Sequence, residues 1–118
     1  MMVGVDLIEV ERIREAVARF GERFLRKVFT LGERAYCFGR ADPYPHLAAR
    51  WAAKEAFMKA LGTGWGKGVR WTDIEVISGG GKPYLVLKGR ALELLGRRRT
   101  EVSLSHTKSY AVAVVLIQ

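Results

Sequence analysis

The sequence has few of the residues that build disulfides or membrane spans. Its 118 residues include a single cysteine, Cys37, which we expect in the core. One cysteine excludes an internal disulfide and a zinc site built from cysteines, so we expect a reducing, cytoplasmic setting. No window approaches the ~20 apolar residues of a membrane-spanning helix, and no membrane partner is expected. We expect no signal peptide, because the first residues lack a basic start and Asp6 interrupts their apolar run.

Acidic residues are scarce relative to basic ones. The chain carries 20 lysines and arginines against 12 aspartates and glutamates, which gives a formal net charge of +8. A field of that sign concentrates nucleic acid, acidic lipid, acidic proteins or polyphosphate ligands, and composition does not choose among them. Half of the residues are apolar and no segment has low complexity, as in globular proteins. A chain of this length is expected to form one domain, residues 1–118, around one core.

The first third of the chain changes from a strand period to a helical one. Alternating apolar residues predict a strand over 2–10. A helical period follows over 10–28, and Gly21 is expected to break or bend that helix. A threonine and a glutamate at capping-box spacing then predict a short helix over 31–38.

The rest of the chain predicts one long helix and two strand pairs. We expect residues 41–45 to form a loop and an alanine-rich helix to run over 46–61, where glycines end it. The later elements are strands over 71–78 and 82–89 joined by a glycine hairpin, a short helix over 90–99, and strands over 101–107 and 109–118. This order predicts an α+β domain with a mainly antiparallel sheet packed against a long central helix.

Two carboxylates and a lysine are candidates for chemistry. Asp6 lies inside an apolar strand, where a carboxylate must face solvent at an edge, form an ion pair or bind a cation. Glu55 precedes Lys59 by four residues, a spacing that also fits an ordinary helical ion pair worth ~0.3–0.5 kcal/mol. Taken together, Asp6 and Glu55 predict a magnesium site, because magnesium binds one or two carboxylates together with waters and phosphates. Lys59 would then meet a phosphate oxygen beside the metal.

The loop after the long helix could bring backbone N–H groups to the same anion. On a helical wheel Gly62 lies on the same side of the helix as Glu55 and Lys59. Ala48 and Ala52 lie on this side too, and their small side chains predict a shallow groove. The glycines of "GTGWGKG" at 62–68 would let backbone N–H groups approach a phosphate. The segment is not a Walker A loop, because it follows a helix instead of opening one. Glycines in this position also serve simply as a helix cap.

Histidines and arginines supply further candidates. His106 lies at a strand end among serine, threonine and lysine, where it is either a turn residue or one of several phosphate-compatible donors. We expect His46 to cap the long helix. Arg12, Arg19 and Arg23 are spaced to lie along one side of the first helix, with few matching acids. Such a stripe is either a solvated face or a docking surface for an acidic helix.

Three separated segments together resemble one known family. "VGVDLIEVERI" at 3–13, "RWAAKEAFMKALGTG" at 50–64 and "VSLSHTKSYAVAVV" at 102–115 closely resemble the holo-acyl-carrier-protein synthases. These are the small 4′-phosphopantetheinyl transferases of bacterial fatty-acid synthesis. The likeness covers nearly the whole chain and includes "GKPYLVL" at 81–87. It implies an enzyme that moves the phosphopantetheine arm of coenzyme A onto a serine of apo acyl carrier protein and releases adenosine 3′,5′-bisphosphate.

The resemblance implies a role for particular residues. Asp6 and Glu55 match the family's magnesium ligands. Lys59 matches the lysine that faces the coenzyme pyrophosphate. Arg50 and His106 match residues near the 3′-phosphate of the nucleotide.

The resemblance also implies contacts beyond the reacting phosphates. Gly62 and Pro83 match residues that line the coenzyme cleft. The first helix of the family docks the acidic carrier protein, a role that falls here to Arg12, Arg19 and Arg23. Family members are usually homotrimers with active sites between subunits, so the resemblance implies a homotrimer.

Two other functions stay open on the residues alone. A nucleic-acid-binding module would use the positive charge and the "GRRRT" run at 96–100, although the first helix shows no interleaved aromatic platform. A metal-dependent phosphohydrolase would use the same two carboxylates and cleave coenzyme A without a carrier protein. We expect the transferase, with no nucleic-acid partner.

Overall fold

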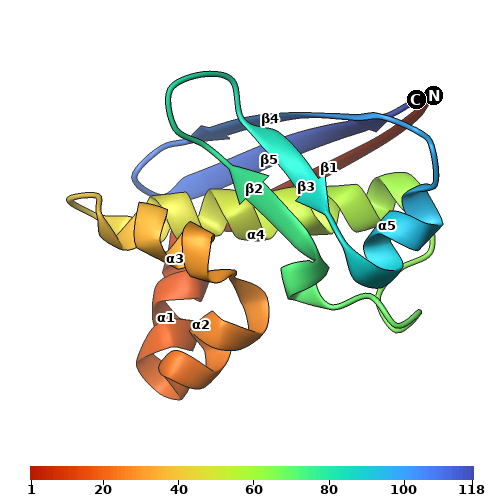
Figure 1. Cartoon of the computed structure of the whole chain (residues 1–118). Helices are drawn as coiled ribbons and strands as arrows, with labels where there is room; N and C mark the ends of the chain where they lie inside the picture. The colour runs from red at the N-terminus through yellow and green to blue at the C-terminus, as the bar shows by residue number, and fades with distance from the viewer.

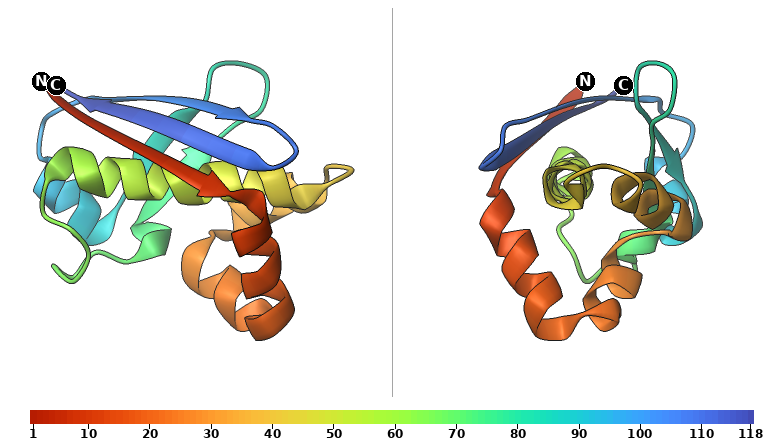
Figure 2. Two further views of the ribbon diagram at one scale, coloured as in Figure 1. Left: turned by 180° about the vertical axis from the view of Figure 1, so that it is seen from behind. Right: turned by 90° about the vertical axis from the view of Figure 1, so that its left-hand side faces the viewer.

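A computed structural model describes all 118 residues as a single domain built around one long helix (Figure 1). The elements in chain order are β1 (Met2–Glu9), α1 (Val10–Phe20), α2 (Glu22–Val28), α3 (Leu31–Phe38), α4 (Pro43–Leu61), the 3₁₀-helix η1 (Trp71–Asp73), β2 (Ile74–Ile77), β3 (Tyr84–Leu87), α5 (Gly89–Leu95), β4 (Thr100–His106) and β5 (Tyr110–Ile117). The right-hand view of Figure 2 looks along α4, with the three-stranded sheet on one side and α1 and α2 on the other. No helix of the chain combines the length and apolarity needed to cross a membrane.

The α+β class with antiparallel pairing around a central helix is confirmed, and the strands form two sheets. One sheet has the order β1-β5-β4, and the other is the pair β2-β3. In the larger sheet Val5 pairs with Val114 of β5, which pairs in turn with Ser103 of β4. Because β5 is central, β1 and β4 form opposite edges of this sheet.

The predicted start of α4 was wrong. The helix begins at Pro43, and 41–45 is therefore only partly a loop. Proline fits the first helical turn, where its missing N–H has no helical partner. The Asp42 side chain caps the helix by accepting a hydrogen bond from the Tyr44 N–H at 3.1 Å. His46 lies inside the helix and does not cap it.

Three other predicted elements are clearly shorter than expected. The strand predicted over 82–89 extends only over Tyr84–Leu87. The strand predicted over 71–78 begins at Ile74, because residues 71–73 form the 3₁₀ turn. The helix predicted over 90–99 ends at Leu95, where Gly96 takes a φ of 67°. Positive φ is readily available to glycine, so the helix stops before the arginine run.

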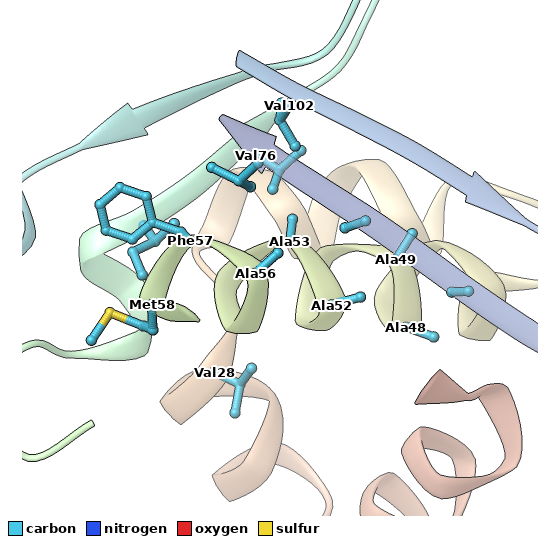
Figure 3. Close-up of a cluster of buried hydrophobic side chains, with 14 of the residues drawn as sticks. Val28, Ala48, Ala49, Ala52, Ala53, Ala56, Phe57, Met58, Val76 and Val102 are labelled. Carbon is cyan, nitrogen blue, oxygen red and sulfur yellow. The ribbon is translucent and has the colours of Figure 1, made fainter. Parts of the chain in front are cut away.

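The core lies between α4 and the elements around it. Figure 3 shows the alanines of α4 between Val76 and Val102 of the two sheets and Val28 of α2. At Gly4 the strand β1 crosses α4 so closely that an added Cβ would overlap the carbonyl oxygen of Ala56. This close approach places the middle of β1 directly beside the C-terminal half of α4.

A buried ion pair ties α4 to the smaller sheet. Lys54 Nζ lies 2.8 Å from Glu33 Oε1, and both side chains are fully buried. The same ammonium donates to the carbonyl of Trp71 at 3.1 Å and to that of Ile74. Glu33 accepts a hydrogen bond from the Val76 N–H at 2.8 Å. These bonds fix η1 and β2 against the helical turn that carries Glu55.

Candidate active site

Asp6 and Lys59 meet where β1 crosses α4. Asp6 lies on the face of β1 that is turned toward α4, because the inward residues alternate along this strand. Lys59 Nζ lies 2.9 Å from Asp6 Oδ1 and 3.1 Å from the carbonyl oxygen of Val5. Of the three explanations for a carboxylate in this strand, the structure shows an ion pair.

Glu55 lies one helical turn before Lys59 but forms no ion pair with it. The ordinary helical ion pair that their spacing also allowed is therefore absent. Burial raises the pKa of Glu55 above its usual value, and the nearby Asp6 carboxylate raises it further. The indole of Trp65 and the ammonium of Lys59 act in the opposite direction. Two carboxylates therefore lie close enough to repel each other, with one ammonium beside them.

A hollow of about 270 Å³ opens beside these groups. Its lining residues are Glu55, Met58, Lys59, Gly62, Gly64 and Trp65. Gly62 ends α4 with a φ of 77°, and its N–H bonds the carbonyls of Met58 and Lys59 at 3.0 and 3.1 Å. That N–H caps the helix, so Gly62 shapes the hollow by having no side chain.

The predicted groove beside Ala48 and Ala52 was wrong. Both alanines are fully buried in the core, because β1 and α1 pack on this part of α4. A helical wheel places residues around an axis but does not show which neighbours cover them. The hollow lies further along the helix, toward its C-terminal end.

Arg50 and His106 belong to a second cluster. The guanidinium of Arg50 is buried, lies 4.3 Å from the ring centre of Tyr36 and donates to the carbonyl of His46 at 3.1 Å. The rings of His46 and His106 are 4.8 Å apart. Burial lowers the pKa of His46, and the neighbouring His106 and Arg50 lower it further. Arg50 Nε is buried without a hydrogen-bond partner.

The two clusters lie on opposite flanks of α4. Five residues of helix correspond to about 500° of rotation, so Arg50 and Glu55 lie roughly 140° apart around the axis. Asp6 is on β1 and His106 is on β4, which are the two edge strands of the sheet. Within one chain the structure therefore does not bring the predicted nucleotide residues to the carboxylates.

Pro83 also lies apart from the hollow. It precedes β3, and its neighbour Lys82 forms an ion pair with Glu101 of β4 at 3.0 Å. Pro83 is not among the residues that line the hollow with Gly62, with which it was predicted to line one cleft.

The predicted docking arginines are exposed on two helices. Arg12 and Arg19 lie on α1, whereas Arg23 lies on α2, and none of the three forms an ion pair within the chain. Gly21 separates the helices with a φ of 57°, as its position predicted. Arg23 borders a hollow of about 280 Å³ lined also by Phe20, Phe24 and Lys27. The three arginines are thus exposed positive charges, and Arg23 lies beside a hollow lined by two phenylalanines.

The residues at the hollow fit a divalent cation. Asp6 already holds a cationic group, the Lys59 ammonium, and Glu55 faces the same space. No three aspartate, glutamate, histidine or cysteine side chains are grouped as a complete metal site. Magnesium binds through one or two carboxylates and completes its shell with waters and substrate phosphates, so the donor set suits this metal.

The class of protein follows from a match to a known family. A family model described as the 4′-phosphopantetheinyl transferase superfamily matches residues 2–115, and the chain belongs to this family. The family resemblance of the three sequence segments is therefore confirmed.

Within this family, the chain is similar to the holo-[acyl-carrier-protein] synthases. The holo-[acyl-carrier-protein] synthase of Chlamydia trachomatis serovar D is 48% identical over 116 residues, which cover 98% of each chain. That of Koribacter versatilis is 47% identical over 119 residues, covering 98% of this chain and 95% of its own. Among solved structures, the Helicobacter pylori holo-[acyl-carrier-protein] synthase in complex with coenzyme A superposes with a TM-score of 0.88 at 29% identity, covering 99% and 100% of the two chains. A synthase from Bacillus anthracis gives a TM-score of 0.82 at 35% identity, with 98% and 94% covered.

Proposed function

We propose that this chain transfers the 4′-phosphopantetheine group of coenzyme A to a serine of apo acyl carrier protein. The products are holo acyl carrier protein and adenosine 3′,5′-bisphosphate. Family membership and the names of the relatives give the reaction class. The observation that carries the proposal is that Glu55 and Lys59 line one hollow while Lys59 also contacts Asp6, since two carboxylates and an ammonium suit a metal-bound pyrophosphate.

In this proposal each residue has a separate task. Asp6 and Glu55 would hold magnesium, which when bound neutralises the pyrophosphate and polarises the phosphoryl group. Lys59 stabilises the negative charge that grows on the leaving nucleotide phosphate. The serine hydroxyl attacks the phosphorus in line, so a new bond from serine oxygen to phosphorus forms while the bond to the nucleotide phosphate breaks. The hydroxyl proton is released to water.

Release of the nucleotide product tests the reaction class. We expect adenosine 3′,5′-bisphosphate to form from coenzyme A only when apo acyl carrier protein is present. Release without the carrier protein would favour a phosphohydrolase instead. Intact coenzyme A, with tight and salt-sensitive binding of nucleic acid, would favour the nucleic-acid-binding alternative.

We further propose that the active enzyme is a homotrimer whose sites are shared between neighbouring chains. Within one chain the predicted nucleotide residues and the carboxylates lie on opposite flanks of α4, whereas two neighbouring chains could bring one flank of each together. The outer face of the sheet offers a surface for assembly, because Val3, Val5 and Leu7 are 58%, 53% and 66% exposed.

Leu7→Asp is expected to dissociate this assembly. A carboxylate at the centre of an apolar interface loses its hydration without gaining a partner. Sedimentation velocity should show a single-chain species for Leu7→Asp and the larger species for the wild type. Leu92→Asp is the matched control, since Leu92 is 48% exposed on α5, away from this sheet face, and should leave the larger species intact. A wild type that sediments as a single chain at micromolar concentration would contradict the proposal.

Arg12→Glu is expected to weaken binding of the acidic carrier protein by roughly tenfold at low salt, because complementary charge steers and orients such complexes. Its affinity for coenzyme A should stay within about twofold of the wild type, since Arg12 lies on α1 outside the hollow. Calorimetric titrations with each substrate measure the two affinities separately. The exposed Arg97 provides the control: Arg97→Glu makes the same charge change beyond α5. Equal loss of both affinities in Arg12→Glu would refute its role in docking.

A further inference from the structure

All three tryptophans of the chain form one continuous stack. Trp65, in the glycine loop, packs on Trp71 of η1 with ring centroids 4.0 Å apart and an interplanar angle of 22°. Trp71 packs on Trp51 of α4 at 4.3 Å and 25°. Phe24 of α2 extends the stack at 6.1 Å from Trp51. Although glycines flank Trp65 on both sides, this stack fixes the plane of its indole.

The same stack is anchored to the turn of α4 that carries Glu55. Lys54, the residue before Glu55, donates from its buried ammonium to the carbonyl of Trp71 at 3.1 Å. Trp71 is the middle ring, so its backbone and its side chain both link the glycine loop to α4. The position of Trp65 relative to Glu55 is therefore set by a hydrogen bond and two ring contacts.

The indole N–H of Trp65 is a buried donor without a hydrogen-bond acceptor. Trp65 Nε1 is inaccessible to solvent and forms no hydrogen bond. Trp65 and Glu55 line the same hollow, and Glu55 carries the only carboxylate among its lining residues. A buried N–H that stays unpaired costs ~1–3 kcal/mol, so a small movement that completes this bond is favoured.

We propose that Trp65 is a positioning residue that donates its indole N–H to one oxygen of Glu55 and turns the other oxygen toward Asp6. This inference rests on the proposed metal-dependent transfer. Indole suits the task because it only donates and cannot itself ligate a cation. Groups that hydrogen-bond a metal-binding carboxylate and so orient it commonly affect metal affinity almost as strongly as the ligand itself. Trp65 thus gives the Glu55 carboxylate a fixed orientation, although the loop that carries Trp65 consists largely of glycine.

Trp65→Phe tests this role, because phenylalanine keeps a ring on Trp71 and removes the N–H. We expect the affinity of the substrate-free protein for Mn²⁺, measured by electron paramagnetic resonance, to fall about tenfold or more. We also expect the magnesium concentration for half-maximal transfer to rise by a similar factor, with kcat largely recovered at saturating magnesium. Trp51→Phe is the matched control, since it removes an indole from the same stack but has no ring contact with Trp65, and it should leave Mn²⁺ affinity within about twofold of the wild type.

A second variant distinguishes the effect of losing the N–H from the effect of a smaller ring. Benzothienylalanine at position 65 replaces the N–H by sulfur in a bicyclic ring of nearly the same shape, and it should reproduce the loss of Mn²⁺ affinity. Wild-type affinity in this variant, or equal losses in Trp65→Phe and Trp51→Phe, would overturn the proposal. A wild-type protein that binds no Mn²⁺ and transfers no phosphopantetheine would instead overturn the proposed function on which the inference rests.

Discussion

Glu55→Gln is expected to lower the rate of phosphopantetheine transfer by a hundredfold or more, as the loss of a main electrostatic group at a reacting phosphate does in other enzymes. Glutamine has the same shape but no charge, so it neither attracts a divalent cation strongly nor balances the Lys59 ammonium. Glu55 makes no ion pair, and the replacement should therefore leave the melting temperature within a few degrees of the wild type. Asp6→Asn should have a similar effect on rate, although it also removes the contact with Lys59.

The controls for Glu55→Gln address metal binding and the reaction separately. Glu93→Gln, which removes only an exposed carboxylate 3.4 Å from Arg90, should transfer at the wild-type rate. Mn²⁺ titration should show weakened binding for Glu55→Gln and unchanged binding for Glu93→Gln. A Glu55→Gln enzyme that transfers at the wild-type rate would exclude Glu55 as a ligand or catalytic group.

Glu33→Ala is expected to lower the free energy of unfolding by about 3–5 kcal/mol, the usual cost of leaving a buried charge without its partner. Glu33 and Lys54 are both fully buried, and Glu33 also completes the capping box of α3 by accepting from the Thr30 N–H at 2.9 Å. Urea denaturation measures the loss. The matched variant is Glu101→Ala, which removes an exposed partner of Lys82 and should cost no more than about 1 kcal/mol.

The pH dependence of Glu33→Ala gives a further check on this explanation. Burial already lowers the pKa of Lys54, and Glu33 opposes that shift, so removing Glu33 lowers the pKa further. In the window between this lowered value and the ordinary lysine pKa, the unfolded chain binds more protons than the folded one. Stability of the variant should therefore rise as the pH is raised through that window. Similar losses for Glu33→Ala and Glu101→Ala, or no recovery at high pH, would contradict a role for the buried charge.

The site could be predicted in part because its carboxylates and lysine stand in distinctive local settings. Asp6 is an acid within an apolar strand, and Glu55 precedes Lys59 by one helical turn. The contact between Asp6 and Lys59 joins residues 53 positions apart, so it depends on β1 crossing α4 at Gly4, which no local period reveals. The roles of these residues in metal and coenzyme binding stay predictions.

Other features depend on tertiary packing that a single sequence does not show. The wheel placed Ala48 and Ala52 beside the carboxylate correctly, but β1 and α1 cover them. Trp65 was overlooked because the glycines around it indicated only a backbone site for an anion or a helix cap. Its importance comes from two other tryptophans that stack on it in the folded chain. The separation of Arg50 and His106 from the carboxylates likewise follows from which strands form the sheet edges.

Intact-mass spectrometry of apo acyl carrier protein tests the central claim most directly. The carrier protein is incubated with coenzyme A, magnesium and either the wild-type chain or Glu55→Gln. We predict that the carrier protein gains the mass of one phosphopantetheine group with the wild type, and that this gain is lost with Glu55→Gln or when EDTA removes the metal. An unchanged carrier-protein mass with a folded wild-type chain, or an equal gain in the presence of EDTA, would contradict a magnesium-dependent phosphopantetheinyl transferase.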